Sequence, residues 1–188
     1  VEATVAAIEN AKIVVAQINP RMPRTFGDSV LHISEIDYGV EIDMPIHGHE
    51  MGIISPVENK IGQYVASLID DRSTLQMGIG SIPNAALANL TNHKDLGLHT
   101  EMFSDGVIDL IESGVINCKY KGINRGQALA TFLVGSQRLY DFVDNNQFID
   151  MRVSNYVNDT SRIRRNTKMV AINSAIEVDI TGQVSADS

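Results

Sequence analysis

The sequence predicts an α/β fold in which a mostly parallel open sheet carries helices on both of its faces. Short apolar runs alternate along the chain with segments of helical periodicity, which is the pattern of strand–helix–strand units. Runs such as residues 128–134 lack polar alternation, so we expect strands that are buried on both sides. The chain has 188 residues, enough to bury the core of one domain or slightly more.

Composition restricts the possible partners. The chain has 15 Lys and Arg against 23 Asp and Glu, a formal net charge of −8, whereas binding to nucleic acid needs a cationic face. The one cysteine, Cys118, excludes an internal disulfide framework and a multi-cysteine metal site, and it suits a reducing cytosol. Apolar stretches are far shorter than the roughly 20 residues of a membrane span, and the N-terminus has no signal-peptide pattern. We therefore expect a cytoplasmic protein without nucleic-acid or membrane partners, and the missing initiator Met suggests a start inside a longer gene product.

The first expected strand covers residues 13–18, a largely β-branched run that we expect to be covered on both faces. Asn19-Pro20 ends this strand. The loop that follows is rich in Arg and Pro, and residues 30–43 are expected to be extended or irregular.

A helix is expected to begin after Ser55. Ser55 caps it, Pro56 takes the first helical position, where no N–H is needed, and Glu58 completes a capping box. The apolar residues that follow recur with helical spacing and predict a stripe that faces the core. They are Val57, Ile61, Tyr64, Val65, Leu68 and Ile69.

Four strand–loop–helix units are expected next, followed by a hairpin that turns at Thr181-Gly182. In such sheets ligands bind beyond the carboxyl ends of the strands, so the loops after the strands are the candidate sites. The strands are expected at residues 74–79, 96–100, 128–134, 148–153, 169–172 and 176–180, and the helices near 82–90, 106–113, from 136, and 159–165.

The segment from Gln76 to Asn84 lies where a strand becomes a helix. It resembles half of a dinucleotide-binding fingerprint, but Pro83 occupies the third glycine position and no Lys-Ser/Thr pair makes it a P-loop. Gly78 and Gly80 leave backbone N–H groups exposed near a helix N-terminus, which suits a phosphate or a developing oxyanion. The alternative is a tight turn that packs under the helix.

Glu101 follows the next strand, beside the glycine-rich turn. A carboxylate in that position can act as a nucleophile or as a general base. The alternative is an acid near a helix start, where negative charge is favoured.

Two histidines, His47 and His49, could share a metal ion on an extended segment, with Glu50 as a third ligand. No further Cys or His partner is evident, so loop histidines are the favoured interpretation and we expect no metal site.

Basic residues suggest two other anion sites. Arg21 and Arg24 flank a proline that would stiffen the geometry that carboxylates or phosphates need, although the Arg24–Asp28 spacing also permits an ion pair. A second cluster could meet a nucleotide phosphate, but a solvated helix is the favoured interpretation. Its members are Arg162, Arg164, Arg165 and Lys168.

Five segments together resemble the acetyl-CoA hydrolase/transferase family, and within it the branch of CoA-transferases for acetyl, butyryl and 4-hydroxybutyryl groups. The resemblance runs in order over nearly the whole chain. The segments are residues 19–29, 78–85, 99–106, 138–142 and 172–179.

The resemblance implies a mechanism and a set of site residues. Coenzyme A is a substrate rather than a resident cofactor, and Glu101 is the nucleophile that forms an acyl-glutamyl anhydride and then a glutamyl-CoA thioester. Asn155 orients the substrate or the anhydride. The rival acid Glu177 lies in a strand-like segment, and we interpret it either as a support for the site residues or as structural. The oxyanion and CoA-binding residues are Gln76, Gly78, Ile79 and Gly80, and the substrate-binding candidates are Met22 and Arg24.

The resemblance also implies that residues 1–70 end an N-terminal CoA-transferase domain and that residues 71–188 begin the C-terminal domain. Family members are longer at both ends, so we expect a central portion that lacks a downstream glycine-rich loop. The implied partners are an acyl-CoA, a short-chain carboxylate and a second copy in a dimer. Two alternatives stay open, an acyl-CoA hydrolase and a non-catalytic module that binds CoA or a sugar phosphate.

Overall fold

The computed structural model describes residues 1–49 and 52–186, and its centre is a parallel sheet. Two three-stranded parallel sheets, ordered β10-β4-β5 and β2-β9-β7, are joined edge to edge by a bridge between His99 and Leu129. The strands are β1 Val15–Ile18, β2 Phe26–Gly27, β3 Tyr38–Glu41, β4 Thr74–Met77, β5 Gly97–Leu98, β6 Met102–Phe103, β7 Ala128–Ala130, β8 Phe132–Leu133, β9 Ile149–Met151, β10 Met169–Ile172, β11 Glu177–Val178 and β12 Val184–Ser185.

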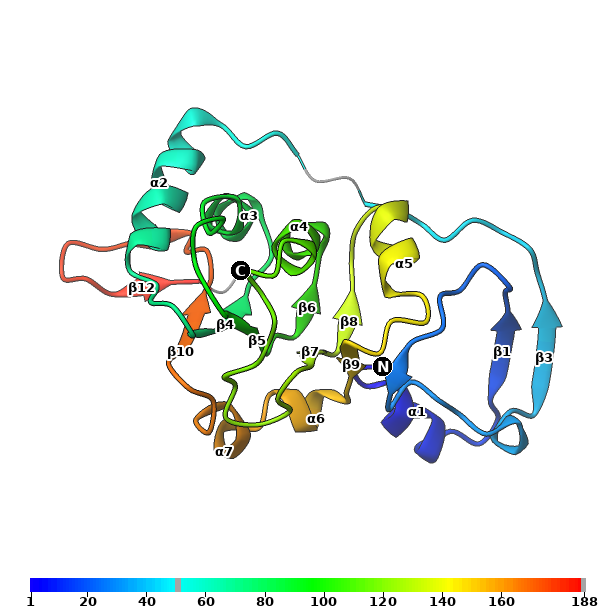
Figure 1. Cartoon of the computed structure of the whole chain (residues 1–188). Helices are drawn as coiled ribbons and strands as arrows, with labels where there is room; N and C mark the ends of the chain where they lie inside the picture. The colour runs from blue at the N-terminus through cyan, green and yellow to red at the C-terminus, as the bar shows by residue number, and fades with distance from the viewer. Residues whose placement is uncertain (50–51, 187–188) are drawn as a thin grey trace.

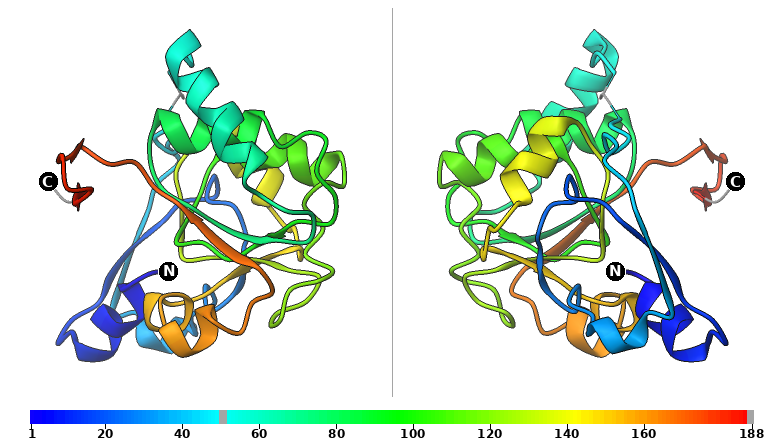
Figure 2. Two further views of the ribbon diagram at one scale, coloured as in Figure 1. Left: turned by 90° about the vertical axis from the view of Figure 1, so that its left-hand side faces the viewer. Right: turned by 90° about the vertical axis from the view of Figure 1, so that its right-hand side faces the viewer.

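Helices cover both faces of this sheet, as predicted. Figure 2 shows α2, α3, α4 and α5 on one side and α1, α6 and α7 on the other. The helices are α1 Thr4–Asn10, α2 Pro56–Ser67, α3 Ser81–Ala88, α4 Ile108–Glu112, α5 Gln137–Val143, α6 Ser154–Val157 and α7 Thr160–Ile163, with 3-10 turns η1 Ile33–Glu35 and η2 Asp105–Val107.

The apolar strands form the middle of the core. Leu75, Leu98, Leu129 and Ile149, one from each of four neighbouring strands, are at most 1% exposed. For β7, where Ala128 and Ala130 are fully buried as well, this confirms the prediction of a strand that is covered on both sides. The expected hairpin is also present, because β11 and β12 pair antiparallel around Thr181-Gly182.

Helix α2 begins as predicted, but its predicted apolar stripe faces the core only in part, through Ile69, which is 6% exposed, and the partly buried Val65. The capping box is complete, because Ser55 Oγ accepts from the Glu58 N–H at 3.3 Å and Glu58 Oε2 accepts from the Ser55 N–H at 2.7 Å. The stripe residues Tyr64 and Leu68 are 63% and 83% exposed. The helix instead packs on α3 through small residues: a Cβ added to Gly62 would lie 2.4 Å from the Ala85 carbonyl oxygen, so only glycine allows this approach.

The first predicted strand exists as β1, but it is not covered on both faces. Val15 and Ile18 are 63% and 48% exposed, and β1 pairs in parallel with β3 in a separate two-stranded sheet (Figure 1, right). An apolar run therefore predicted the strand correctly, while its covering layer is absent from the described residues. Within the same ranges no helix is long and apolar enough to cross a bilayer.

Candidate active site

A cavity of about 320 Å³ opens where β4 and β5 diverge at their carboxyl ends. The strands pair at Leu75 and Leu98, but the next residue, His99, bridges to Leu129 on the other side. The chain that carries Glu101 thus turns away from β4 and towards β7. Gln76, Glu101, Asn158 and Asn173 supply polar groups to the cavity, over an apolar lining that includes Val157, Ile163 and Met169.

Glu101 is held by its backbone rather than by its carboxylate. Its carbonyl oxygen accepts from the N–H groups of Thr131 at 2.8 Å and Phe132 at 3.2 Å, and from the Thr131 hydroxyl at 3.1 Å. The side chain is half-buried, and no donor from the described part of the chain occupies its carboxylate. A fixed backbone with a free carboxylate is the arrangement that a nucleophile or a general base needs.

The residue before Glu101 links it to the glycine loop. The Thr100 hydroxyl accepts from the Met77 N–H and donates to the Met77 carbonyl, both at 3.1 Å. Thr100 and Met77 are 1% and 3% exposed, so this side chain replaces the backbone ladder where the strands separate. The end of β4 and the start of the Glu101 turn are therefore fixed side by side.

The loop after β4 turns into α3 as expected, but the Gly78 N–H, which the sequence suggested as a free donor, is already used. The Gly78 N–H donates to the Ile172 carbonyl at 2.8 Å, and Gly80 has φ of +115° where it caps α3. Ile79 is 69% exposed, and none of the described acceptors takes its N–H. The loop thus offers an unused N–H one residue beyond a tight turn, which suits an oxyanion.

Gln76 and Asn173 form a reciprocal amide pair across β4 and the end of β10. Gln76 Nε2 donates to Asn173 Oδ1 at 3.2 Å, and Asn173 Nδ2 donates to Gln76 Oε1 at 3.0 Å. The pair keeps both amides in fixed orientations in the cavity of Glu101. Sequence reasoning placed Gln76 in the site but missed Asn173.

His99 connects the Glu101 strand to the opposite wall. Its Nε2 lies 2.7 Å from the Val157 carbonyl oxygen, and its Nδ1 lies 3.0 Å from Asn166 Nδ2. Burial lowers the pKa of the His99 imidazole, which fits a neutral ring that donates from Nε2 and accepts at Nδ1. Its only sequence signal is a polar residue at the end of an apolar strand, two positions before Glu101.

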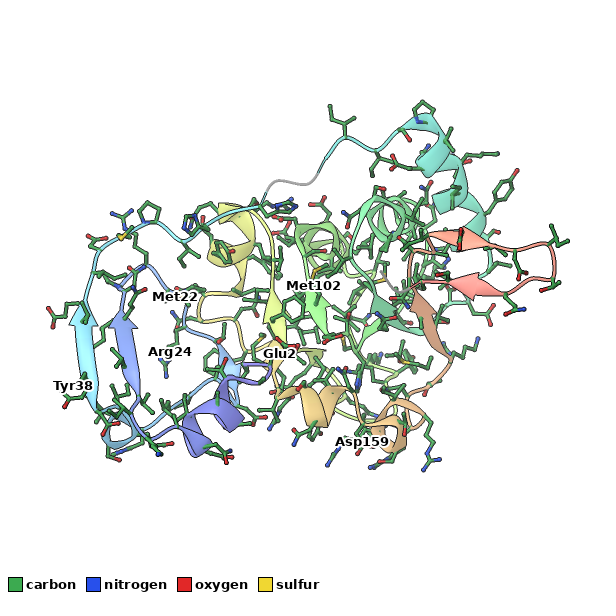
Figure 3. The ribbon with its side chains drawn as sticks, turned by 180° about the vertical axis from the view of Figure 1, so that it is seen from behind. Glu2, Met22, Arg24, Tyr38, Met102 and Asp159 are labelled. Atoms are coloured by element: carbon green, nitrogen blue, oxygen red, sulfur yellow. The ribbon has the colours of Figure 1, made fainter. Side chains whose placement is uncertain are left out.

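The other predicted site residues lie apart from this cavity. Asn155, on α6, is exposed and does not line the cavity, whereas Asn158 does. Met22 lines a second cavity of about 470 Å³, which shares no lining residue with the first. Figure 3 shows Met22 and Arg24 well away from Met102, the neighbour of Glu101.

Arg24 does not form the ion pair that its spacing permits. The backbone N–H of Arg24 donates to Asp144 Oδ1 at 2.7 Å, and its guanidinium lies 5.5 Å from the Phe26 ring centroid. Asp28 pairs instead with Arg152, at 3.0 Å. His47 and His49 lie on a loop. The His47 carbonyl accepts from the Tyr140 hydroxyl at 2.9 Å, and Glu50 lies outside the described residues. In the ranges that are described, no three His, Cys, Asp or Glu side chains form a metal-binding group.

Comparisons with known proteins give one consistent result. The model of the acetyl-CoA hydrolase/transferase C-terminal domain matches residues 135–188. The chain is 48% identical to 4-hydroxybutyrate coenzyme A transferase of Clostridium kluyveri, over 98% of this chain and 43% of that protein. It is 49% identical to a succinyl-CoA:acetate/propanoyl-CoA:succinate CoA transferase of Fasciola hepatica, over 100% of this chain and 40% of that protein.

Solved structures agree. A 4-hydroxybutyrate CoA-transferase of Porphyromonas gingivalis matches with a TM-score of 0.93 at 45% identity, covering 97% of this chain and 47% of that one. RipA of Yersinia pestis matches with a TM-score of 0.95 at 32% identity, covering 100% of this chain and 44% of that one. The chain thus spans about two fifths of the length of these curated relatives. Sequence and fold thus match the same group of proteins, and the chain belongs to the acetyl-CoA hydrolase/transferase family.

Proposed function

We propose that the chain carries the catalytic glutamate of a short-chain CoA-transferase, which moves CoA between an acyl-CoA and a carboxylate such as acetate, butyrate or 4-hydroxybutyrate. The single observation that carries the proposal is the free, half-buried carboxylate of Glu101, fixed by its backbone on a turn that Thr100 joins to Met77, where the Ile79 loop begins. The named activities of the relatives, which transfer CoA to and from short-chain acids, support the substrate class.

In this proposal, Glu101 attacks the thioester carbonyl, a C–O bond forms and the C–S bond breaks, which gives an acyl-glutamyl anhydride and CoA thiolate. The thiolate then attacks the glutamyl carbonyl and releases the acyl group as a carboxylate, which leaves a glutamyl-CoA thioester. The acceptor carboxylate reverses both steps. A carboxylate is a weak nucleophile, so the Ile79 N–H contributes by stabilising the oxyanion, an effect of about 3–4 kcal/mol for one such donor.

Several assignments belong to the same proposal. The amide pair of Gln76 and Asn173 orients the thioester, and Asn155 approaches the substrate from α6. Met22 contacts the acyl-CoA or acceptor from the second cavity, and Arg24, two positions further along the chain, contributes a cation. Residues 1–70 and 71–188 belong to the N-terminal and C-terminal domains of the whole protein. We further propose a cytoplasmic homodimer, which sedimentation of the purified protein would check.

Covalent trapping of Glu101 tests the mechanism. The polypeptide that carries this sequence is incubated with acetyl-CoA, treated with borohydride or hydroxylamine, and mapped by mass spectrometry. We expect modification at Glu101, its loss in Glu101→Gln, and its retention in Glu177→Gln, a control acid in the exposed strand β11. Modification at another residue, or an active Glu101→Gln variant, contradicts the proposal. Hydrolysis that does not depend on added acetate would indicate an acyl-CoA hydrolase instead.

A further inference from the structure

A third cavity, lined mainly by residues with cationic side chains, lies at the amino-terminal edge of the sheet, at the starts of β4 and β10. Its volume is about 570 Å³, within the roughly 300–1,000 Å³ range of small-molecule sites. It shares no lining residue with the Glu101 cavity, which lies at the carboxyl ends of the same strands. Its lining residues are Arg72, Lys119, Tyr120, Arg125, Thr167 and Lys168.

Four of these six residues are cationic, in a chain whose net charge is −8. Two are paired with carboxylates: Lys168 Nζ lies 2.9 Å from Asp70, and Arg72 Nε lies 4.0 Å from Asp95. Among the residues that the structure describes, Lys119 and Arg125 have no carboxylate within 4.0 Å. The cavity therefore keeps an excess of positive charge.

The cations are held in place before any ligand arrives. Two of them lie over the Tyr120 ring, with Arg72 Cζ at 4.4 Å and Lys119 Nζ at 5.5 Å from its centroid. Arg125 Nε donates to the Lys121 carbonyl at 2.9 Å, so only its terminal nitrogens remain for a ligand. Such preorganisation lowers the entropy cost of binding.

The backbone around the cavity is strained. Arg72 and Lys168 have φ of +66° and +44°, and Cys118, next to Lys119, has +57°. This left-handed region is unfavourable for a residue with a side chain, and strained residues cluster where ligands are held. The two strained cations both line the cavity, which favours a binding role over a solvated surface.

We propose that this cavity binds a polyphosphate chain, either inorganic or as part of a nucleotide. Several cations arranged around one space suit an anion with several charged groups, and guanidinium groups bind phosphate oxygens in pairs. Thr167, a residue with a neutral hydroxyl, also lines the cavity. The site is independent of the transfer reaction proposed for Glu101.

Calorimetry with sodium tripolyphosphate at constant ionic strength tests the site. We compare the chain with its Lys119→Glu variant, since Lys119 is exposed and its substitution leaves the core intact. The matched control is Lys60→Glu: Lys60 is also exposed and lies 4.9 Å from the Tyr64 ring centroid, on α2. We expect Lys119→Glu to weaken binding about tenfold or more, and Lys60→Glu to change it less than about twofold.

The ligand source is distinguished by a parallel titration with ATP. Tighter binding of ATP than of tripolyphosphate identifies a nucleotide, and equal binding identifies the phosphate chain alone; both support the site. The proposed site is overturned if neither ATP nor tripolyphosphate binds, or if the two lysine variants lose affinity equally. Backbone NMR shifts should concentrate at residues 119–125 and 167–168, and shifts centred on residues 76–80 and 101 instead would also overturn it.

Discussion

Asn173 Oδ1 lies where a side chain on Gly78 would begin. A Cβ built on Gly78 would be 2.5 Å from that oxygen and 3.0 Å from the Ile172 carbonyl. Because Gly78 has no side chain, β10 can approach the end of β4, and the amide of Asn173 can reach Gln76 in the cavity of Glu101. The glycine is thus needed for the position of a neighbouring amide as well as for the turn.

Gly78→Ala should displace Asn173 and break its amide pair with Gln76. We expect a destabilisation of about 1–3 kcal/mol from overpacking, and a lower rate of CoA transfer if the proposed function is correct. Gly52→Ala is the control, since a Cβ there would meet nothing within 4 Å. Side-chain amide NMR signals of Gln76 and Asn173 report the pair directly, and unchanged signals in Gly78→Ala would contradict this account.

Thr100→Val should destabilise the fold. The substitution keeps the shape but leaves the buried N–H and carbonyl of Met77 without partners, at a cost of about 2–4 kcal/mol for the two groups. The exposed Thr160→Val is the control. Urea denaturation measures both, and a loss in Thr100→Val no larger than in the control would show that the hydroxyl does not bridge the strands.

His99 predicts a dependence of stability on pH. Burial lowers the pKa of His99 from 6.5, so below pH 6.5 the unfolded chain binds a proton that the folded chain does not. The contribution of this group to stability is therefore complete above pH 6.5 and decreases as the pH falls towards the lowered pKa. His99→Gln should be less stable at neutral pH but should lose less stability between about pH 7 and pH 5. Chemical denaturation at several pH values checks this, with His32→Gln, an exposed histidine, expected to keep the wild-type slope.

Lys121 predicts a dependence of stability on pH in the alkaline range. Burial lowers its pKa from 10.5 to about 8, although its Nζ donates to the Gln127 carbonyl at 2.8 Å. Below pH 8 both states are protonated and the burial cost is present. Between pH 8 and 10.5 the unfolded chain holds the extra proton, so stability rises with pH.

Lys121→Met should lack this rise. As the pH increases through this range, the free energy of unfolding of the wild type should rise by up to about 3 kcal/mol relative to that of Lys121→Met. Denaturation of both proteins at matched pH values measures the difference, in which groups that they share cancel. The exposed Lys94→Met should follow the wild type. A difference that stays constant with pH would show that the Lys121 ammonium is not buried at this cost.

The sequence predicts local structure better than it predicts which surfaces meet. The capping box of Ser55 and Glu58 is local chemistry, so the start of α2 was predictable. The covered side of that helix was predictable only at Val65 and Ile69, because Gly62 gives no hydrophobic signal and yet makes the close contact with α3. Leu68, in contrast, gives a strong hydrophobic signal, yet the described residues leave its side chain exposed.

The candidate site divides in the same way. Glu101 and the loop after Gln76 follow neighbouring apolar runs, and the carboxyl ends of parallel strands meet at one edge, so their proximity was predictable. Asn173 was not, because its partner Gln76 is 97 positions away in the sequence. The role of His99 was hidden for the same reason, since its partners Val157 and Asn166 are 58 and 67 positions away.

The sheet of β1 and β3 bears on how this polypeptide behaves at high concentration. Both strands have largely exposed side chains, and a two-stranded sheet presents unpaired backbone groups along its two edges. These edges offer a template on which other molecules can add strands. The exposed apolar residues of α2 add a second surface for association. The 188-residue chain in dilute buffer should therefore form oligomers whose size grows with protein concentration, and lysine substitutions at Val15 and Val40 should suppress that growth.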